Sequence, residues 1–318
     1  MTPRLASDAA LDAGQIDARQ RLIAIGLMAL ATVCFAGLDT TAKYLTTAHA
    51  VPVAQVVWLR FAGHVVFSAV VLWPFALKPS VRSAKPVIQI VRSCFMILTT
   101  GLNFIALKYL QLDQNITIFF LTPLLVAALA GPLLGEWIGW HRVLAIIAGF
   151  IGVLVVMHPG IGTVHWAMLL TLTATVGYAL YNIATRYLAP FDPASVTQTY
   201  TPLVGVLLMM PFGLAAWQSP DSWFLWFLFA TLGFWGGLGH WMLILAHRHA
   251  PAPVLAPYIY LGLIWMSFAG FLVFDDLPTW WTLGGGGVVI LAGLYLFARE
   301  RKTLGAAKAG PASDIASQ

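Results

Sequence analysis

Charge is what this sequence lacks most. Only 9% of its 318 residues are Asp, Glu, Lys or Arg, whereas about a quarter of the residues in a soluble globular protein are charged. With 60% hydrophobic residues and a mean hydropathy of +0.84, too little charge remains to coat a folded surface in water. The composition therefore excludes an ordinary soluble protein. It predicts a chain that lies mostly in a lipid bilayer, as apolar helices of about 20 residues each.

Other scarcities remove whole classes of function. The two cysteines, Cys34 and Cys94, lie inside apolar runs, so neither a disulfide framework nor a metal site is expected. The sequence has no G-x-x-x-x-G-K-[ST] motif, which argues against ATP hydrolysis by the chain itself. The net charge of +5 comes from basic residues in short gaps between apolar runs. Because they form no dense patch, nucleic acid is not expected as a partner. No cofactor is expected, and the expected partners are the bilayer and a small molecule.

Ten apolar runs are long enough to span a membrane, which predicts an all-α integral membrane protein. The gaps between them are short, so consecutive helices are expected to run antiparallel. An inside location for the N-terminus places 13 of the 17 Lys and Arg on the cytoplasmic side. Both termini are therefore expected in the cytoplasm, with the chain in the cell inner membrane. The expected spans are 22–46, 52–75, 87–107, 112–134, 140–158, 163–188, 194–217, 222–247, 251–274 and 278–298.

The two halves of this region repeat each other. Residues 31–45, ATVCFAGLDTTAKYL, align without gaps with residues 174–188, ATVGYALYNIATRYL, and six of the fifteen positions are identical. The same offset of 143 carries Gln55 onto Gln198. Because each unit has five spans, an odd number, the second unit must enter the membrane in the opposite direction. Such an inverted repeat is typical of transporters, whose ligand site lies near the middle of the membrane between the units.

The repeat divides the chain into four parts. A polar N-terminal tail over 1–21 precedes the first five-helix unit at 22–158. The second unit follows at 163–298, and a C-terminal tail at 299–318 ends the chain.

Two stretches carry a resemblance to a known family. Residues 105–160 contain an "-AL-Y-" turn, a helix with an internal proline, a Gly-Glu loop and a Gly-rich final helix. Residues 271–300, FLVFDDLPTWWTLGGGGVVILAGLYLFARE, are similar to the end of the same unit in the second half. Together with the span count, the chain resembles the drug/metabolite transporter superfamily, with two EamA-like units. The loop of the second unit has Asp275-Asp276 where the family often has Gly-Glu.

Charged residues inside spans are costly and usually face a cavity or a partner. Asp39 and Lys43 are four residues apart on one face of the first helix, so they are expected to pair, with Arg60 of the second helix competing for Asp39. This cluster either lines the transport path or is a structural pair in which Lys43 extends to the surface. Arg92 is expected to extend to the membrane surface in the same way. The excess of positive charge favours an anionic or electron-rich cargo.

Buried amides and aromatic rings complete the candidate site. Asn103 and Asn115 lie in spans that the resemblance places beside a central cavity, and Asn182 is the repeat counterpart of Asp39. Each buried amide must be hydrogen-bonded, either to another helix or to a ligand. Aromatic side chains on the sixth, eighth and ninth spans are suited to stacking on a planar ring, with packing in the core or against lipid as the alternative. Those assigned to the site are Tyr178, His240, Trp241 and Tyr258.

Prolines and glycines mark where helices bend and pack. Pro123 and Gly131-Pro132 are expected to open the fourth span, and Pro253 and Pro257 the ninth. Because the prolines do not align between the units, the two breaks are expected at different depths. The fifth and tenth spans carry small-residue faces, which predict close packing within the chain or between two copies as a homodimer.

These observations favour a non-enzymatic secondary transporter that moves a small organic metabolite by alternating access. A flat aromatic or heterocyclic cargo, such as a vitamin or nucleoside-like compound, is expected from the aromatic residues and from a resemblance of DTTAKYL at 39–45 to such importers. The alternatives are an exporter of amino acids or drugs with the same fold, or an intramembrane enzyme.

Overall fold

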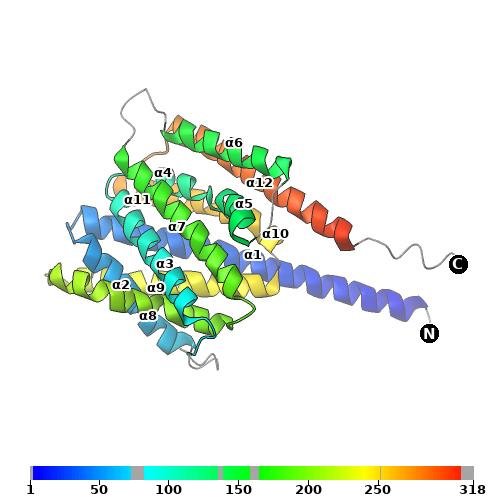
Figure 1. The fold of residues 1–318 in the computed structure, drawn as a ribbon, viewed down its shortest axis with the longest axis horizontal. Coiled ribbons are helices and arrows are strands. Elements are labelled where there is room, and N and C mark those ends of the chain that lie inside the picture. Colours follow the sequence, from blue (N-terminus) through cyan, green and yellow to red (C-terminus); the bar gives the residue numbers. More distant parts are fainter. Residues whose placement is uncertain (1–2, 73–81, 135–138, 158–164, 251, 309–318) are drawn as a thin grey trace.

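The computed structural model describes residues 3–72, 82–134, 139–157, 165–250 and 252–308, and within these ranges all regular structure is helical. Figure 1 shows one bundle with both termini at the same end. We call this the terminal end and the opposite end the far end. The helices are α1 (Pro3–Thr47), α2 (Val53–Phe67), the π-helical η1 (Ser68–Leu72), α3 (Pro86–Leu107), α4 (Leu112–Phe119), α5 (Thr122–Leu134), α6 (Trp140–Met157), α7 (Trp166–Leu188), α8 (Ala194–Ala215), α9 (Trp223–His249), α10 (Ala252–Ile259), α11 (Leu261–Phe274) and α12 (Trp280–Lys308).

The predicted all-α membrane fold is confirmed in these residues. Nine of the described helical segments are long and apolar enough to cross a membrane, and a shorter apolar helix covers Val143–Met157. Two of the crossings are broken, α4 with α5 and α10 with α11. Helix α1 begins at Pro3 and α12 continues to Lys308, so helix extends from the adjoining spans into both predicted tails. Both tails are rich in Ala with Arg, Lys and Gln, residues with high helix propensity that prolong the adjoining spans.

The helix contacts have the pattern that a two-fold relation between the halves would produce. Helix α1 packs along α9, and its repeat counterpart α7 packs along α3. Helix α1 also touches α10 and α11, just as α7 touches α4 and α5. The pairs α2–α8 and α6–α12 each join counterpart helices directly (Figure 1). This exchange of partners supports the predicted inverted repeat.

Glycine allows the closest of these contacts. Gly152 of α6 and Gly285 of α12 face each other so tightly that a Cβ on Gly285 would lie 2.4 Å from the carbonyl oxygen of Gly152. A side chain at either position would push the two helices apart. The small-residue faces predicted on these spans therefore form a seam within the chain.

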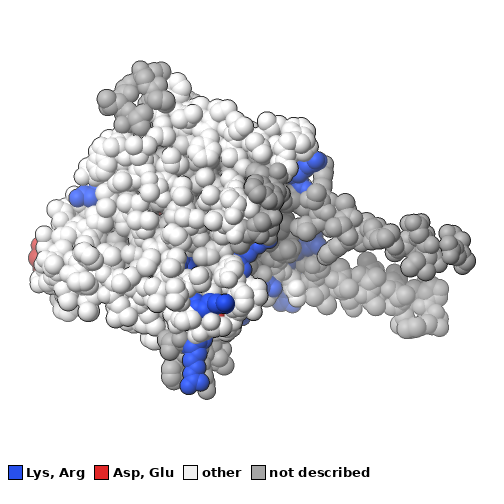
Figure 2. Space-filling view, in the orientation of Figure 1, with Lys and Arg blue, Asp and Glu red and all other residues white. Residues whose placement is uncertain are grey.

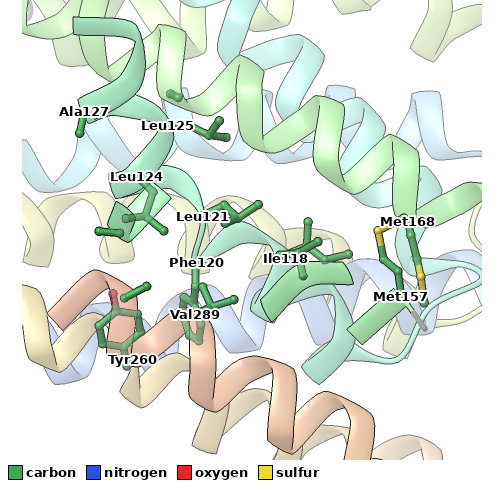
Figure 3. Close-up of a cluster of buried hydrophobic side chains, with 14 of the residues drawn as sticks. Ile118, Phe120, Leu121, Leu124, Leu125, Ala127, Met157, Met168, Tyr260 and Val289 are labelled. Carbon is green, nitrogen blue, oxygen red and sulfur yellow. The ribbon is translucent and has the colours of Figure 1, made fainter. Parts of the chain in front are cut away.

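The two helix breaks meet. The first lies between Phe119 and Thr122, and the second at Tyr260 between α10 and α11. Phe120 and Tyr260 contact each other edge to face, with ring centroids 4.9 Å apart, in a core that also holds Leu121, Leu124 and Val289 (Figure 3). Further along the repeat the offset shifts from 143 to 140, which carries Glu136 onto Asp276 and Phe120 onto Tyr260. The expectation that the breaks differ in depth is therefore wrong: they occupy equivalent positions, although the prolines near them do not.

The outer surface suits lipid. Leucine, isoleucine, valine and phenylalanine side chains are widely exposed on the outward faces of the bundle, and Figure 2 shows a broad surface with little charge. Most of the visible Lys and Arg lie towards the terminal end, at the lower right of that view. Tryptophans at the starts of helices are exposed, for example Trp223 of α9 and Trp280 of α12.

Candidate substrate-binding site

A chain of hydrogen bonds links four helices in the middle of the bundle. The side-chain amide of Asn103 on α3 donates to Asp39 on α1 at 3.1 Å. Asn115 on α4 donates to the side-chain oxygen of Asn103 at 2.6 Å, and Thr171 on α7 donates to that of Asn115 at 2.7 Å. Asp39 keeps partial exposure, whereas the other three are buried. Three predicted site residues are thus brought together, and Asp39 is the member that a ligand can still reach.

Lys43 does not pair with Asp39, which corrects the expectation from their spacing. Its ammonium group forms an ion pair with Asp276, just beyond the end of α11, at 2.8 Å. It also donates to the carbonyl oxygen of Leu110 at 3.0 Å and lies 4.6 Å from the ring centroid of Phe274. Lys43 is on the last turn of α1, so this cluster ties α1 to α11 at the far end, away from the amide chain.

Arg60 lies in the gap between α1 and α9. It is 3% exposed, and its Nε lies 3.6 Å from where a Cβ on Gly236 of α9 would be. The guanidinium carbon is 4.3 Å from the ring centroid of Phe61. Its Nε and Nη1 are buried without an acceptor.

Arg92 does not extend to the surface as expected, since only 2% of it is exposed. Its guanidinium donates to Thr185 of α7 at 2.6 Å and to Thr201 of α8 at 2.7 Å. It also donates to the hydroxyl of Tyr181 and stacks at 4.2 Å on that ring. The length of the arginine side chain would have let it reach water, but neighbouring helices offer enough acceptors to hold it inside. Arg92 therefore joins α3 to α7 and α8.

Asp192 lies in the connection between α7 and α8, near the contacts of Arg92. It accepts hydrogen bonds from the Ser83 hydroxyl, from the Gln89 amide at 2.8 Å and from the backbone N–H of Ala84 at 2.8 Å. Burial raises the pKa of this carboxyl, but the three hydrogen bonds outweigh burial and hold the pKa below its usual range. This side chain fixes the start of α3 against the second half.

Aromatic rings surround the two arginines. Tyr178 and Tyr181, on adjacent turns of α7, lie nearly parallel with centroids 5.8 Å apart, and both keep partial exposure. His240 of α9 stacks on His64 of α2 at 5.7 Å and meets Phe35 of α1 edge to face at 5.2 Å. A planar ligand group near Arg60 would therefore find ring faces on both sides of the seam between the halves.

The remaining predicted residues are less central. Asn182 donates to the backbone oxygen of Tyr178 at 2.7 Å, and Trp241 is half-buried one position after His240. Tyr258 packs on a separate apolar cluster that includes Ala24 and Met28 of α1. It was predicted as one of the aromatic residues of the ninth span.

Sequence reasoning missed other contributors to the site. Tyr181 lies one turn after Tyr178 on α7, and His64 lies one turn after Arg60 on α2. Thr171 donates a hydrogen bond to Asn115 across the contact between α7 and α4. The spacing of Tyr181 three residues after Tyr178 is the one signal that would have found it, since both then share a face of α7.

A small cavity of about 140 Å³ lies elsewhere, at the far end. It is lined by the connection after α1, including His49, and by the connection before α9, including Gln218 and Asp221. Gln55 closes it on one side by exchanging two hydrogen bonds of 2.9 Å with the backbone of Gln218. This cavity is lined mainly by connections between helices and by none of the predicted site residues, so we do not assign it to the substrate-binding site.

Known proteins resemble this chain along most of its length. Residues 22–158 match the EamA-like transporter family. The S-adenosylmethionine uptake transporter of Rickettsia bellii is 28% identical over 286 residues, which cover 89% of this chain and 96% of the relative. The riboflavin transporter of Vibrio cholerae is 25% identical over 280 residues, 86% of this chain and 93% of the relative.

One solved crystal structure shares the fold. It superposes with a TM-score of 0.61 over 90% of this chain and 99% of its own, at 16% sequence identity. The chain is therefore similar to the EamA-like transporter family over 22–158 and to named transporters over most of its length.

Proposed function

We propose that this protein is a secondary transporter of a small organic metabolite with a planar heteroaromatic ring, and that S-adenosylmethionine is its first candidate cargo. The observation that carries the proposal is the arrangement around Arg60. The buried Arg60 and the partly exposed Asp39 adjoin Phe61 and Leu38 in the sequence. These two residues share one core cluster with the parallel rings of Tyr178 and Tyr181 from the other half. Uptake of S-adenosylmethionine by relatives of similar length supports this choice.

The chemistry of the site suits such a molecule. An adenine ring gains by stacking on Tyr178 or Tyr181, and cationic groups of the cargo gain by approaching Asp39. Substrate sites of transporters with inverted repeats lie at the interface of the units, where helices from both halves supply these side chains. Riboflavin is the second candidate, because its flat ring system fits the same aromatic surfaces and relatives are named as its transporters.

The proposed setting is the cell inner membrane, with both termini in the cytoplasm. The bias of Lys and Arg towards the terminal end supports this orientation, and Figure 2 shows that bias on one face. We place the protein among transporters and not among intramembrane enzymes because the relatives that it matches are named as transporters.

Uptake into proteoliposomes tests the proposal. Purified protein is reconstituted, and the entry of radiolabelled S-adenosylmethionine and of riboflavin is measured against empty liposomes. We expect saturable uptake of one of them, and Asp39→Asn should reduce it at least tenfold while the protein remains folded. The exposed Lys108→Gln serves as the matched control for removing one charge. Absence of uptake and of exchange for both compounds, with folded protein in the membrane, would refute the proposed cargo.

A further inference from the structure

Arg60 is the exception among the buried cations of the described chain. The other two, Lys43 and Arg92, are supplied with acceptors: an ion pair and a carbonyl oxygen for Lys43, and three oxygen-bearing side chains for Arg92. Arg60 is equally buried, but no carboxylate in the described residues lies within 4 Å of it. Its Nε and Nη1 have no acceptor at all.

A buried guanidinium without acceptors is costly in a folded protein. Its contact with Phe61 offsets part of that cost, but ring faces supply no hydrogen-bond acceptor for its N–H groups. Buried N–H donors in this condition, at the seam between the two halves, have the chemistry of a binding site for an anion. Arginine is also the side chain whose planar fork matches a carboxylate in two parallel hydrogen bonds.

The neighbouring Asp39 gives this site a second, opposite pole. The Nε of Arg60 and the side chain of Leu38, the residue before Asp39, lie 3.6 and 3.9 Å from the Cβ position of Gly236, so the two charged residues are neighbours in the bundle. The carboxylate is hydrogen-bonded by Asn103, and in the described residues no ion pair joins it to the arginine. Asn103 is in turn held by Asn115, so the carboxylate is fixed in place on the α1 side. A positive pole on α2 and a negative pole on α1 therefore face the same region, and neither neutralises the other by direct contact.

We propose that these two poles bind the amino-acid head of a zwitterionic cargo, with the carboxylate on Arg60 and the ammonium group on Asp39. This inference rests on the proposed function and narrows its cargo to molecules that carry an α-amino acid group beside a planar ring. The ring then lies towards Tyr178 and Tyr181, which pack on the same core cluster as Phe61, the residue after Arg60. Riboflavin has neither charged group, so the site discriminates against it.

The scaffold itself supports a dedicated role for Arg60. The repeat offset of 143 carries Arg60 onto Leu203, so the two-fold pattern of the helices does not require a cation here. The same offset carries Asp39 onto Asn182, which lacks the charge. Both poles therefore occur on the first half only, as expected for groups that recognise a ligand and not for groups that hold the repeat together.

The test compares two ligands that differ only in the carboxylate. S-adenosylmethionine and its decarboxylated form are titrated onto purified wild-type protein and onto Arg60→Gln, Asp39→Asn and the control Lys108→Gln. We expect the wild type to bind S-adenosylmethionine at least tenfold more tightly. Arg60→Gln should lose between about ten- and a hundredfold for S-adenosylmethionine, the range for a charge-assisted hydrogen bond, and change little for the decarboxylated form. Asp39→Asn should weaken both ligands, and Lys108→Gln neither.

The outcomes separate this inference from the function on which it rests. If Arg60→Gln weakens both ligands equally or leaves both unchanged, the carboxylate subsite is wrong and the transporter proposal stands. Binding of riboflavin without binding of either adenosyl compound has the same meaning. If no compound of the panel binds or is transported, both proposals fail. Should Arg60→Gln not fold, equal affinity of the wild type for the two adenosyl ligands overturns the subsite without any variant.

Discussion

Replacing Asp276 by Asn should favour opening of the bundle at its far end. Lys43 on the last turn of α1 forms an ion pair with Asp276 beyond α11. These two helices belong to different halves of the chain, so they do not separate at the far end unless the pair breaks. Any state in which the far end is open has lost this interaction already, and the substitution therefore weakens only the closed state.

The size of the effect follows from burial. Breaking a fully buried ion pair costs about 3–5 kcal/mol, whereas an exposed pair contributes about 1 kcal/mol or less. The side chain of Lys43 is 10% exposed and that of Asp276 is 24% exposed, and Lys43 keeps the carbonyl of Leu110. We therefore expect about 1–2 kcal/mol, which corresponds to a shift of about 5- to 30-fold towards the open state.

Thiol labelling measures this shift. A single cysteine replaces Asp39, one turn of α1 below Lys43, in a chain from which Cys34 and Cys94 have been removed. A membrane-impermeant maleimide is added on the far-end side, and labelling rates are compared with and without Asp276→Asn. While the open state is the minor one, the rate is proportional to its population, so it should rise about 5- to 30-fold. A cysteine at Asn182, probed from the terminal end, should label no faster.

The exchange of charges supplies the control. Lys43→Asp with Asp276→Lys should return the labelling rate towards that of the parent, because an ion pair of the opposite sense can form. If Asp276→Asn leaves the rate at position 39 unchanged, the pair does not hold the far end closed. If the exchanged protein labels as fast as the single variant, the effect of Asp276 is not an effect of pairing.

Three further predictions concern the scaffold. Gly285→Leu should lower the melting temperature measurably, because overpacking the α6–α12 seam costs about 1–3 kcal/mol. The control Gly284→Leu should change the melting temperature little, because there is open space at the Cβ position of Gly284. Equal melting temperatures for the two variants would contradict this packing. Asp192→Asn should destabilise the protein at neutral pH. Because the pKa of Asp192 in the folded protein is depressed, the difference in stability between variant and wild type should be constant above about pH 5. It should shrink as the pH falls below the ordinary pKa of about 3.9. A thermal-shift series in which this difference grew on acidification would contradict the prediction. A reporter fused after Gln318 should be active only in its cytoplasmic form, and labelling from outside would reverse the proposed orientation.

Much of the fold was predictable because the membrane imposes a local rule. Each crossing needs about 20 apolar residues, so spans can be read from short windows of sequence without knowing their neighbours. The charged candidates stood out for the same reason, since a residue such as Arg60 inside an apolar run has a high cost. The sequence thus indicates which residues are unusual, although it does not indicate their partners.

Partners across the fold were not predictable from local spacing. The four-residue spacing of Asp39 and Lys43 is a local signal, but the partner of Lys43 is 233 residues away and reaches it only because α11 ends beside α1. The helix breaks show the same limit. Pro123 follows its break, whereas Pro257 precedes the break at Tyr260. A proline permits a break nearby, but the packing of Phe120 on Tyr260 sets the position, and that contact joins two halves of the chain.

The meeting of the two breaks has a consequence for leakage across the membrane. Phe120 and Tyr260 touch at the points where α4 meets α5 and where α10 meets α11, and Gly293 leaves room for Tyr260 because any Cβ there would overlap its hydroxyl. A change of angle at one break therefore presses directly on the other, so the two broken helices change shape together. A bundle coupled in this way resists being open at both ends at once, the state that would let protons and ions run down their gradients. In the secondary transporter proposed here, the contact at the centre of the core would act against dissipation of the driving gradient.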